Sequence, residues 1–294
     1  MKDSTRNVSG SVINSISKFY PFLIGGSADV SKSTMARIIE TENFSHETPL
    51  GRNINFGIRE NAMASIGNGI ALMGLTPFVS TFFSFSDFLK PGIRMSALMD
   101  LPVIYVFSHD SISVGEDGPT HQPVEQLVAL RAVPNFDLYR PSDANEVIGS
   151  YKSALLNRKP CAIVLGRNKV PIFENTSSND VSKGCYIVRK EKDKLEAIII
   201  SSGEEFSIAN EVYESLLEKG YGVRLVSMPS MSIFERQSDI YKNEILPSNV
   251  KTFVIEASSS LSWYKYVKNE QFLFTLDSFG SSGKKDDVYR KYGF

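Results

Sequence analysis

The chain has 294 residues, of which 42% are hydrophobic and 22% are charged, and its formal net charge is −1. That length and composition are sufficient for about two folded domains, whereas the balanced charge excludes a general field for a nucleic-acid backbone or an anionic membrane. Recognition of phosphate must therefore be local. The polar Met1–Gly10 segment resembles no secretory signal, and no apolar run is long enough to span a membrane. Cys161 and Cys185 lie far apart without metal-binding spacing, which favours a cytoplasmic protein with free thiols.

Short apolar runs alternate with helical patterns up to residue 171, which predicts a parallel sheet covered by helices. The expected strands are Phe22–Ile24, Asn53–Phe56, Phe78–Thr81, Val103–Ser108, Phe136–Tyr139 and Ala162–Leu165. The expected helices are Ser11–Lys18, Glu60–Met73, Phe85–Met99 and Asp143–Leu156. A polar, glycine-bearing loop is expected over residues 110–120.

The pattern is lost over residues 172–184, which are rich in Asn and Ser and are interpreted as a linker. A second, smaller α/β unit is expected over residues 185–294. Its strands are expected near Ala197–Ile200, Val223–Val226, Thr252–Ile255 and Phe272–Thr275, and its helices near Glu205–Glu218 and Trp263–Lys268. The predicted fold class is therefore α/β, with one parallel-sheet domain at 1–171 and another at 185–294.

Polar and aromatic residues follow most strands of the first unit. They are Ser27, Asp29, Arg59, Glu60, Phe82, Phe85, His109, Asp117, His121 and Arg167. Open parallel sheets bind ligands beyond the carboxyl ends of their strands, so these side chains are expected to meet at one edge.

Each candidate also has an ordinary structural interpretation. Glu60, in the first turn of a helix, could simply complement the helix dipole, and His109 could be a hydrogen-bonded residue at the end of a strand. Phenylalanines at this spacing are more often core residues. Arginines suit phosphate binding, but no spacing here requires it, and solvated or paired side chains are an equal alternative for Arg6, Arg94, Arg140 and Arg167.

The loop between His109 and His121 favours function, because it combines histidines, carboxylates, glycines and prolines without apolar periodicity. The residues alone indicate an α/β protein whose sheet edge could handle an anionic polyol. They do not name a reaction.

Several segments form recognisable motifs. They are Gly25–Asp29 (GGSAD), Phe56–Glu60 (FGIRE), the long and specific His109–Glu125 (HDSISVGEDGPTHQPVE), Arg140–Glu146 (RPSDANE), Phe279–Gly283 (FGSSG) and the Tyr292–Phe294 ending. Together they closely resemble the motifs of the transketolase family. The resemblance extends over nearly the whole chain. It implies the family's pyrimidine-binding domain followed by its C-terminal domain.

The resemblance implies thiamine diphosphate as the cofactor, with Glu60 as the glutamate that binds its aminopyrimidine ring and so promotes ylid formation. Phe85 is expected to stack on that ring, Phe82 and Phe88 to line its pocket, and Asp29 to add a further contact. Asn61 departs from the family pattern, which usually has histidine after the glutamate; this change is expected to weaken function.

The resemblance also implies substrate roles. His121 is expected near the reacting carbonyl oxygen, and Asp117 at a sugar hydroxyl. Arg6, Ser33, His109 and Arg167 resemble the residues that grip the sugar phosphate. The implied reaction moves a two-carbon ketol unit from a ketose phosphate to an aldose phosphate.

The family's Gly-Asp-Gly motif, which holds Mg²⁺ and the diphosphate, does not occur in this sequence. The expected metal ligands are therefore on a partner. The chain is expected to be one subunit of a split transketolase, active only with a separate N-terminal-half subunit and associating as a dimer or heterotetramer. The alternative is a non-catalytic or specialised sugar-phosphate-binding subunit.

Overall fold

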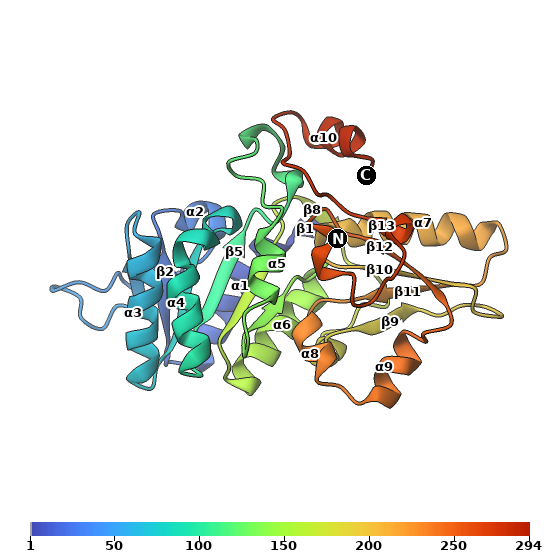
Figure 1. Cartoon of the computed structure of the whole chain (residues 1–294). Helices are drawn as coiled ribbons and strands as arrows, with labels where there is room; N and C mark the ends of the chain where they lie inside the picture. The colour runs from blue at the N-terminus through green and yellow to red at the C-terminus, as the bar shows by residue number, and fades with distance from the viewer. Residues whose placement is uncertain (1) are drawn as a thin grey trace.

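Apolar strands that are buried on both faces form a parallel sheet in the N-terminal part of the chain (Figure 1). The computed structural model describes residues 2–294, and within them this sheet has six strands. In spatial order they are β3 (Asn53–Asn55), β2 (Leu23–Ser27), β4 (Thr76–Phe82), β5 (Ile104–Ser108), β7 (Cys161–Leu165) and β6 (Asp137–Tyr139). Because every pairing is parallel, the carboxyl ends of the strands reach the same edge.

Helices cover both faces of this sheet. One face carries α3 (Glu60–Leu72), α4 (Ser86–Leu98) and α5 (Gln126–Arg131), and the other carries α1 (Thr5–Phe19) and α6 (Ala144–Asn157). Met63 and Ile93 pack with Phe107 on the first face, whereas Ile13 and Tyr151 contribute to the second. A short helix, α2 (Ser31–Thr34), follows β2. This layered core holds the strand ends in fixed positions.

The C-terminal part forms a second layered unit. In the residues that the structure describes, its sheet contains β13 (Leu273–Phe274), β12 (Lys251–Ile255), β10 (Ala197–Ser201), β11 (Val223–Ser227) and β9 (Tyr186–Arg189) in spatial order. Helix α7 (Phe206–Glu218) covers one face, and α8 (Met231–Glu235) and α9 (Asp239–Ile245) lie on the other. The α/β fold class is confirmed. The second sheet is nevertheless mixed, because the edge strand β9 runs antiparallel to β11.

One further segment differs from the sequence prediction. The predicted helix over residues 263–268 is not formed: residues 263–266 form turns after the 3₁₀ turn Ser260–Ser262, and residues 267–268 are irregular. Aromatic and β-branched residues there have low helix propensity, and the buried Trp263 indole instead donates to Glu256 at 2.8 Å. Residues 172–184 contain the 3₁₀ turn Asp180–Lys183, whose Val181 is buried in the core beside α6.

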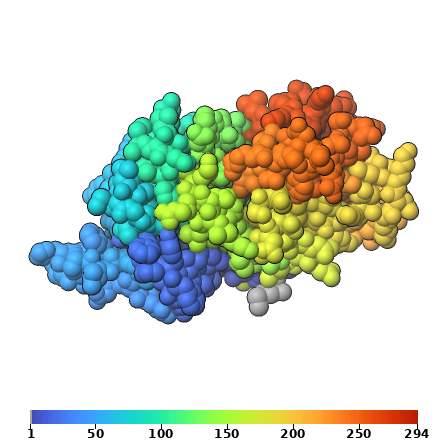
Figure 2. All heavy atoms as spheres, turned by 90° about the horizontal axis from the view of Figure 1, so that it is seen from below, coloured from blue at the N-terminus to red at the C-terminus, as the bar shows by residue number. Residues whose placement is uncertain are grey.

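The ends of the first unit are tied together, and the two units adjoin each other. Strand β1 (Lys2–Ser4) pairs antiparallel with β8 (Lys169–Pro171). Figure 2 shows the two units as neighbouring masses, with a loop near residues 41–50 projecting from the first. None of the helices within residues 2–294 has the length and apolarity that crossing a bilayer requires.

Candidate active site

An aromatic shelf, formed by Phe82, Phe85 and Phe88, lies at the carboxyl end of β4. The chain passes from β4 into the 3₁₀ turn Phe83–Phe85 and then into α4. This turn sends the Phe83 ring into the core, whereas Phe82 and Phe85 remain only partly buried and Phe88 is 62% exposed. The ring centroids of Phe82 and Phe85 are 5.8 Å apart, and those of Phe85 and Phe88 are 6.2 Å apart. Three of the predicted cofactor residues therefore form one surface.

Two histidines from the following loop contact this shelf. The ring of His109 lies 4.0 Å from that of Phe82, measured between centroids. His121 lies 5.9 Å from Phe82 and 5.2 Å from Phe85. The structure therefore brings together residues from β4 and from both ends of the loop, as the sequence predicts.

His109 is buried and has a left-handed backbone, with φ of +65°. Its Nδ1 forms a 2.8 Å hydrogen bond with the Ser108 hydroxyl. Burial lowers the pKa of His109 to about 3, and the neighbouring positive charges of Arg6 and Arg167 act in the same direction. The imidazole is therefore neutral near pH 7, and its N–H group can donate a hydrogen bond to an anion although the ring carries no charge.

Two arginines lie beside His109. Arg6 is in the first turn of α1, whose start is joined to the end of β7 by a 2.7 Å bond between the Gly166 amide and the Thr5 hydroxyl. Its Nη1 donates to the Ser33 carbonyl at 2.8 Å, so Ser33 acts here through its backbone. Arg6 Nε is buried and has no hydrogen-bond partner among residues 2–294. An unpaired buried N–H group favours an acceptor at this position.

Arg167 follows β7 and pairs with Asp117 of the loop at 3.0 Å. Both side chains of this pair keep about 40% of their surface exposed, at 40% and 38%. Burial lowers the pKa of Arg6, and the like charge of Arg167 lowers it further. The two guanidinium groups are close enough to repel each other and create a local positive potential, so a bound anion would reduce their repulsion.

Glu60 begins α3 and is partly buried. The Thr81 hydroxyl donates to its carboxylate at 3.4 Å, which links it to the strand that carries Phe82. Its place at a helix N-terminus is also compatible with the dipole interpretation. Asp29 lies past the end of β2, is exposed and has φ of +64°. No hydrogen bond joins Asp29 to the shelf within the described part of the chain.

Sequence reasoning missed a buried ionic cluster next to His109. Arg140, considered above as a solvated or paired arginine, is fully buried and binds Asp110 through Nη2 at 2.8 Å and Nε at 3.1 Å. Nη2 also lies 2.6 Å from Glu205. Glu256 is 3.5 Å from Arg140 and forms two 2.8 Å bonds with Arg131. Arg140 is therefore committed to carboxylates and is not available to a phosphate.

The cluster joins the two domains and contains more acids than bases. Three carboxylates, from Asp110, Glu205 and Glu256, face the two guanidinium groups of Arg140 and Arg131. Burial raises the pKa of Asp110 to about 7, against the opposing effect of Arg140 and with a further rise from neighbouring glutamates. Only the folded chain brings these residues together, so no local motif could have revealed the cluster.

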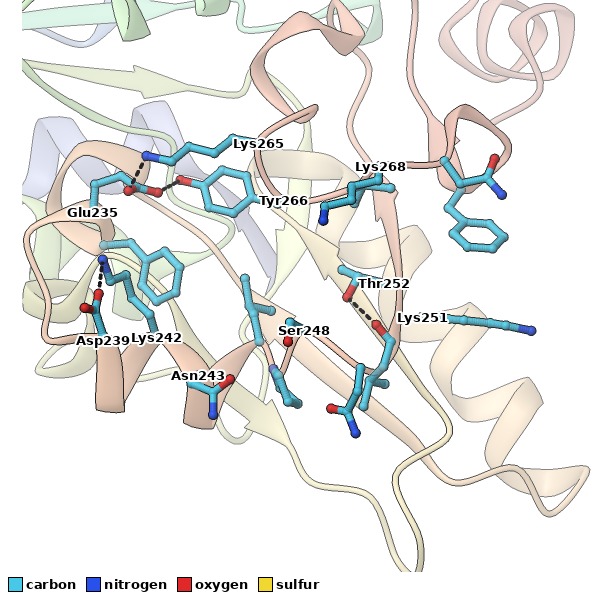
Figure 3. Close-up of a pocket in the computed structure, with 18 residues that line it drawn as sticks. Glu235, Asp239, Lys242, Asn243, Ser248, Lys251, Thr252, Lys265, Tyr266 and Lys268 are labelled. Atoms are coloured by element: carbon cyan, nitrogen blue, oxygen red, sulfur yellow. Dashed lines mark hydrogen bonds and ion pairs between the residues drawn. The ribbon is translucent and has the colours of Figure 1, made fainter.

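A surface depression of about 600 Å³ lies in the second domain, apart from the shelf (Figure 3). Lysines contribute to its lining, but Lys265 is paired with Glu235, and Lys242 with Asp239 at 2.9 Å. Within residues 2–294, no group of three or more His, Cys, Asp or Glu side chains is placed to hold a metal ion.

Comparisons with known proteins agree with this architecture. The family model for the transketolase pyrimidine binding domain matches residues 2–172, and that for the transketolase-like C-terminal domain matches residues 184–294. Transketolases of Staphylococcus epidermidis and Bacillus subtilis are 44% and 46% identical to the chain, over 99% of its length and 45% of theirs. The structure of a transketolase from Leishmania mexicana superposes with a TM-score of 0.95 at 37% identity, covering 99% of this chain and 43% of that one.

The fold and the matched domains define a two-domain α/β protein that consists of a pyrimidine binding domain and a C-terminal domain. More particularly, the chain belongs to the transketolase family. It spans about 45% of the length of the curated relatives that it matches. A structure described as a split gene transketolase, an inactive beta4 tetramer, shares the fold with a TM-score of 0.78 at 23% identity, and the match covers all of this chain and 94% of that one.

Proposed function

We propose that this chain provides the pyrimidine side and the substrate-binding edge of a ketol-transferring active site. The reaction would move a two-carbon unit from a ketose phosphate to an aldose phosphate. The observation that carries the proposal is the meeting of His109 and His121 on the aromatic shelf, with Glu60 joined to the same strand through Thr81. Family membership supports the reaction class.

The residues present fit the pyrimidine part of thiamine diphosphate. The Glu60 carboxylate is partly exposed and can hydrogen-bond a ring nitrogen, while Phe85 offers a flat apolar surface and Phe82 and Phe88 flank it. The bound cofactor would supply an electron sink for a carbanion. Asp29 lies on the same sheet edge and would add an outer contact. The diphosphate and Mg²⁺ would be held by the complementary half.

The residues beside the shelf would bind and orient a phosphorylated sugar. Arg6 and Arg167 would bind the phosphate with the neutral His109, and Ser33 would fix Arg6 through its carbonyl. Asp117 can accept a sugar hydroxyl. His121 would hold or move a proton at the reacting carbonyl oxygen. General acid–base catalysis of this kind typically increases the rate by about 10²–10⁴-fold.

We further propose that a separate N-terminal-half subunit completes the site, most simply in a heterotetramer. Its support is a broad apolar surface on α3, α4 and the segment that precedes α3, toward the left of Figure 1. The exposed side chains there are Ile58, Ile66, Leu72, Phe88, Met95 and Leu98, with exposed fractions between 46% and 79%. Exposed apolar area of this kind is typical of interfaces.

The test is a ketol-transfer assay of this chain alone and of this chain mixed with a transketolase N-terminal half, Mg²⁺ and thiamine diphosphate. We expect activity in the mixture only. Glu60→Gln should then lower kcat/KM at least 100-fold, because it removes the carboxylate that binds the pyrimidine. The same change at Glu47, an exposed loop residue, is the matched control. A stable mixture whose activity does not depend on Glu60 would favour the non-catalytic subunit.

A further inference from the structure

The loop over residues 109–122 is not the irregular segment that its sequence suggests. It contains two 3₁₀ turns, over residues 112–117, joined at Gly115, where φ is +77°. Ser111 caps the first turn by accepting the Ser113 amide at 3.2 Å. Two proposed substrate residues, Asp117 and His121, belong to this loop, so its conformation fixes where they stand.

The side chain of Gln122 holds the loop from within. Only 2% of this residue is exposed. Its amide nitrogen donates to the Gly115 carbonyl at 2.8 Å and to the Ser281 carbonyl at 3.0 Å. An amide NH₂ has two hydrogens, so one is directed to the loop and the other to the C-terminal segment, residues 280–294. Gln122 therefore connects the loop to Ser281, which lies 159 residues further along the chain.

The C-terminal segment lies directly against the loop, as Figure 1 shows at the top of the molecule, where α10 (Lys285–Tyr292) stands beside it. Ser282 donates its hydroxyl to the Glu116 carbonyl at 2.6 Å. Val288 and Tyr289 of α10 share an apolar cluster with Ile112 of the loop. The contact thus combines hydrogen bonds with buried apolar surface.

Glycines permit this close approach. A Cβ atom on Gly280 would lie 1.9 Å from Gln122 Oε1, and one on Gly115 would lie 3.0 Å from the Gly283 carbonyl oxygen. The first distance is impossible without movement. Gln122 Oε1 is itself buried and has no hydrogen-bond partner within residues 2–294. The amide therefore has a desolvation penalty that an apolar side chain would avoid.

The start of the loop is tied to the same segment by a second route. Asp110 binds Arg140, which contacts Glu205, and Glu205 accepts the Tyr289 hydroxyl of α10 at 2.8 Å. The loop is therefore fastened at its beginning through the buried cluster and at its end through Gln122. Both fastenings lead to the C-terminal segment.

We propose that Gln122 is a positioning residue, which together with the C-terminal segment sets the substrate-binding conformation of the loop. This proposal rests on the proposed function for its kinetic consequence, but not for its structural one. Because Gln122 is almost fully buried, the proposal gives it no direct contact with substrate or cofactor. It acts through the backbone at Gly115 and thereby through Asp117 and His121.

The experiment compares Gln122→Leu, which removes both donors at similar volume, with Gln271→Leu at an exposed glutamine of the second domain. Hydrogen exchange of peptides spanning residues 111–121 is measured on the full chain, and kinetics on its complex with the N-terminal half. Two neutral hydrogen bonds contribute about 1 kcal/mol each, and 1.4 kcal/mol is tenfold. We expect loop exchange to accelerate about tenfold or more, and kcat/KM to fall about thirtyfold, chiefly through KM. The Gln271→Leu variant should match the wild type in both.

Unchanged loop exchange in Gln122→Leu overturns the proposal, and so does faster exchange with unchanged kinetics. If the wild-type complex transfers no ketol unit, the proposed function fails, while the exchange comparison still decides whether Gln122 holds the loop. If Gln122→Leu does not fold, Ser282→Ala is tested in its place, because it removes only one exposed hydrogen bond to the loop. Loop exchange that equals wild type in Ser282→Ala then refutes the fastening.

Discussion

Replacing Arg140 with methionine should lower the free energy of unfolding more than the loss of an ion pair on the surface, because Arg140 lies between carboxylates of both domains. The substitution keeps an unbranched apolar stem, is shorter than arginine, and removes the cation between Asp110, Glu205 and Glu256. Glu256 retains its two bonds with Arg131, whereas Asp110 and Glu205 lose their only ion-pair partner within the described residues. Removing one partner of a buried ion pair costs about 3–5 kcal/mol, because a charge is left uncompensated.

That cost translates into a fall of about 6–20 °C in the unfolding midpoint, at roughly 2–4 °C per kcal/mol. The matched control is Arg189→Met, since Arg189 pairs with Glu214 at 3.1 Å on the surface of the second domain. Exposed pairs contribute about 0–1 kcal/mol, so this control should shift the midpoint by a few degrees at most. Scanning calorimetry of the full chain measures both.

The pH dependence gives a second criterion. Burial already raises the pKa of Asp110 to about 7, and loss of the Arg140 cation, which opposes that rise, should raise it further. A raised folded-state pKa means that the native state takes up protons first, so the penalty should shrink as pH falls from 8 to 5. Adding Glu205→Gln should recover part of the loss. The reasoning fails if Arg140→Met costs no more than Arg189→Met, or if its penalty is the same at both pH values.

Two further predictions concern the sheet edge. Arg167→Ala should raise KM for a phosphorylated ketose about tenfold to a hundredfold, because a charge-assisted bond contributes about 1.5–3 kcal/mol. A non-phosphorylated ketol donor should be affected much less, since it loses only the support that Arg167 gives Asp117. Equal losses with both donors in the ketol-transfer assay would contradict a phosphate role. His109 has a folded pKa of about 3, below its ordinary value near 6.5, so its neutral form stabilises the fold fully above pH 6.5 and this contribution declines by about 1.4 kcal/mol per pH unit below it. His109→Asn, which tolerates the left-handed backbone, should therefore flatten the fall in urea-unfolding free energy between pH 7 and 5, and an unchanged slope would refute the argument.

Local patterns were sufficient for much of the fold. The continuous apolar run ending at Ser108 predicts β5 within one residue of its observed start, and the spacing of apolar residues predicts α3 and α4 closely. The rule that ligands collect at strand ends then places Phe82, His109 and Arg167 on one edge, which the structure shows. Their roles in binding remain predictions.

What the sequence could not reveal depends on contacts between distant residues. The edge strand β9 is not predicted at all, because four residues of alternating burial are a weak local signal, and its antiparallel pairing depends on the distant β11. Trp263 lies in a turn because its indole is bound by Glu256, which overrides any helical pattern. Arg140 resembles any other arginine until the second domain supplies Glu205.

The second domain contributes none of the predicted site residues, yet its side chains contact the loop to which some of them belong. Its Ser282 reaches a loop carbonyl across a sequence separation of 166 residues, and its Tyr289 completes the ionic chain to Asp110. A rigid sheet edge can position Phe82 without help, since β4 is buried on both faces, but a polar loop with two left-handed glycines cannot fix itself. If the proposed roles hold, the first domain supplies the chemical groups, and contacts from the second domain restrict the loop that carries Asp117 and His121.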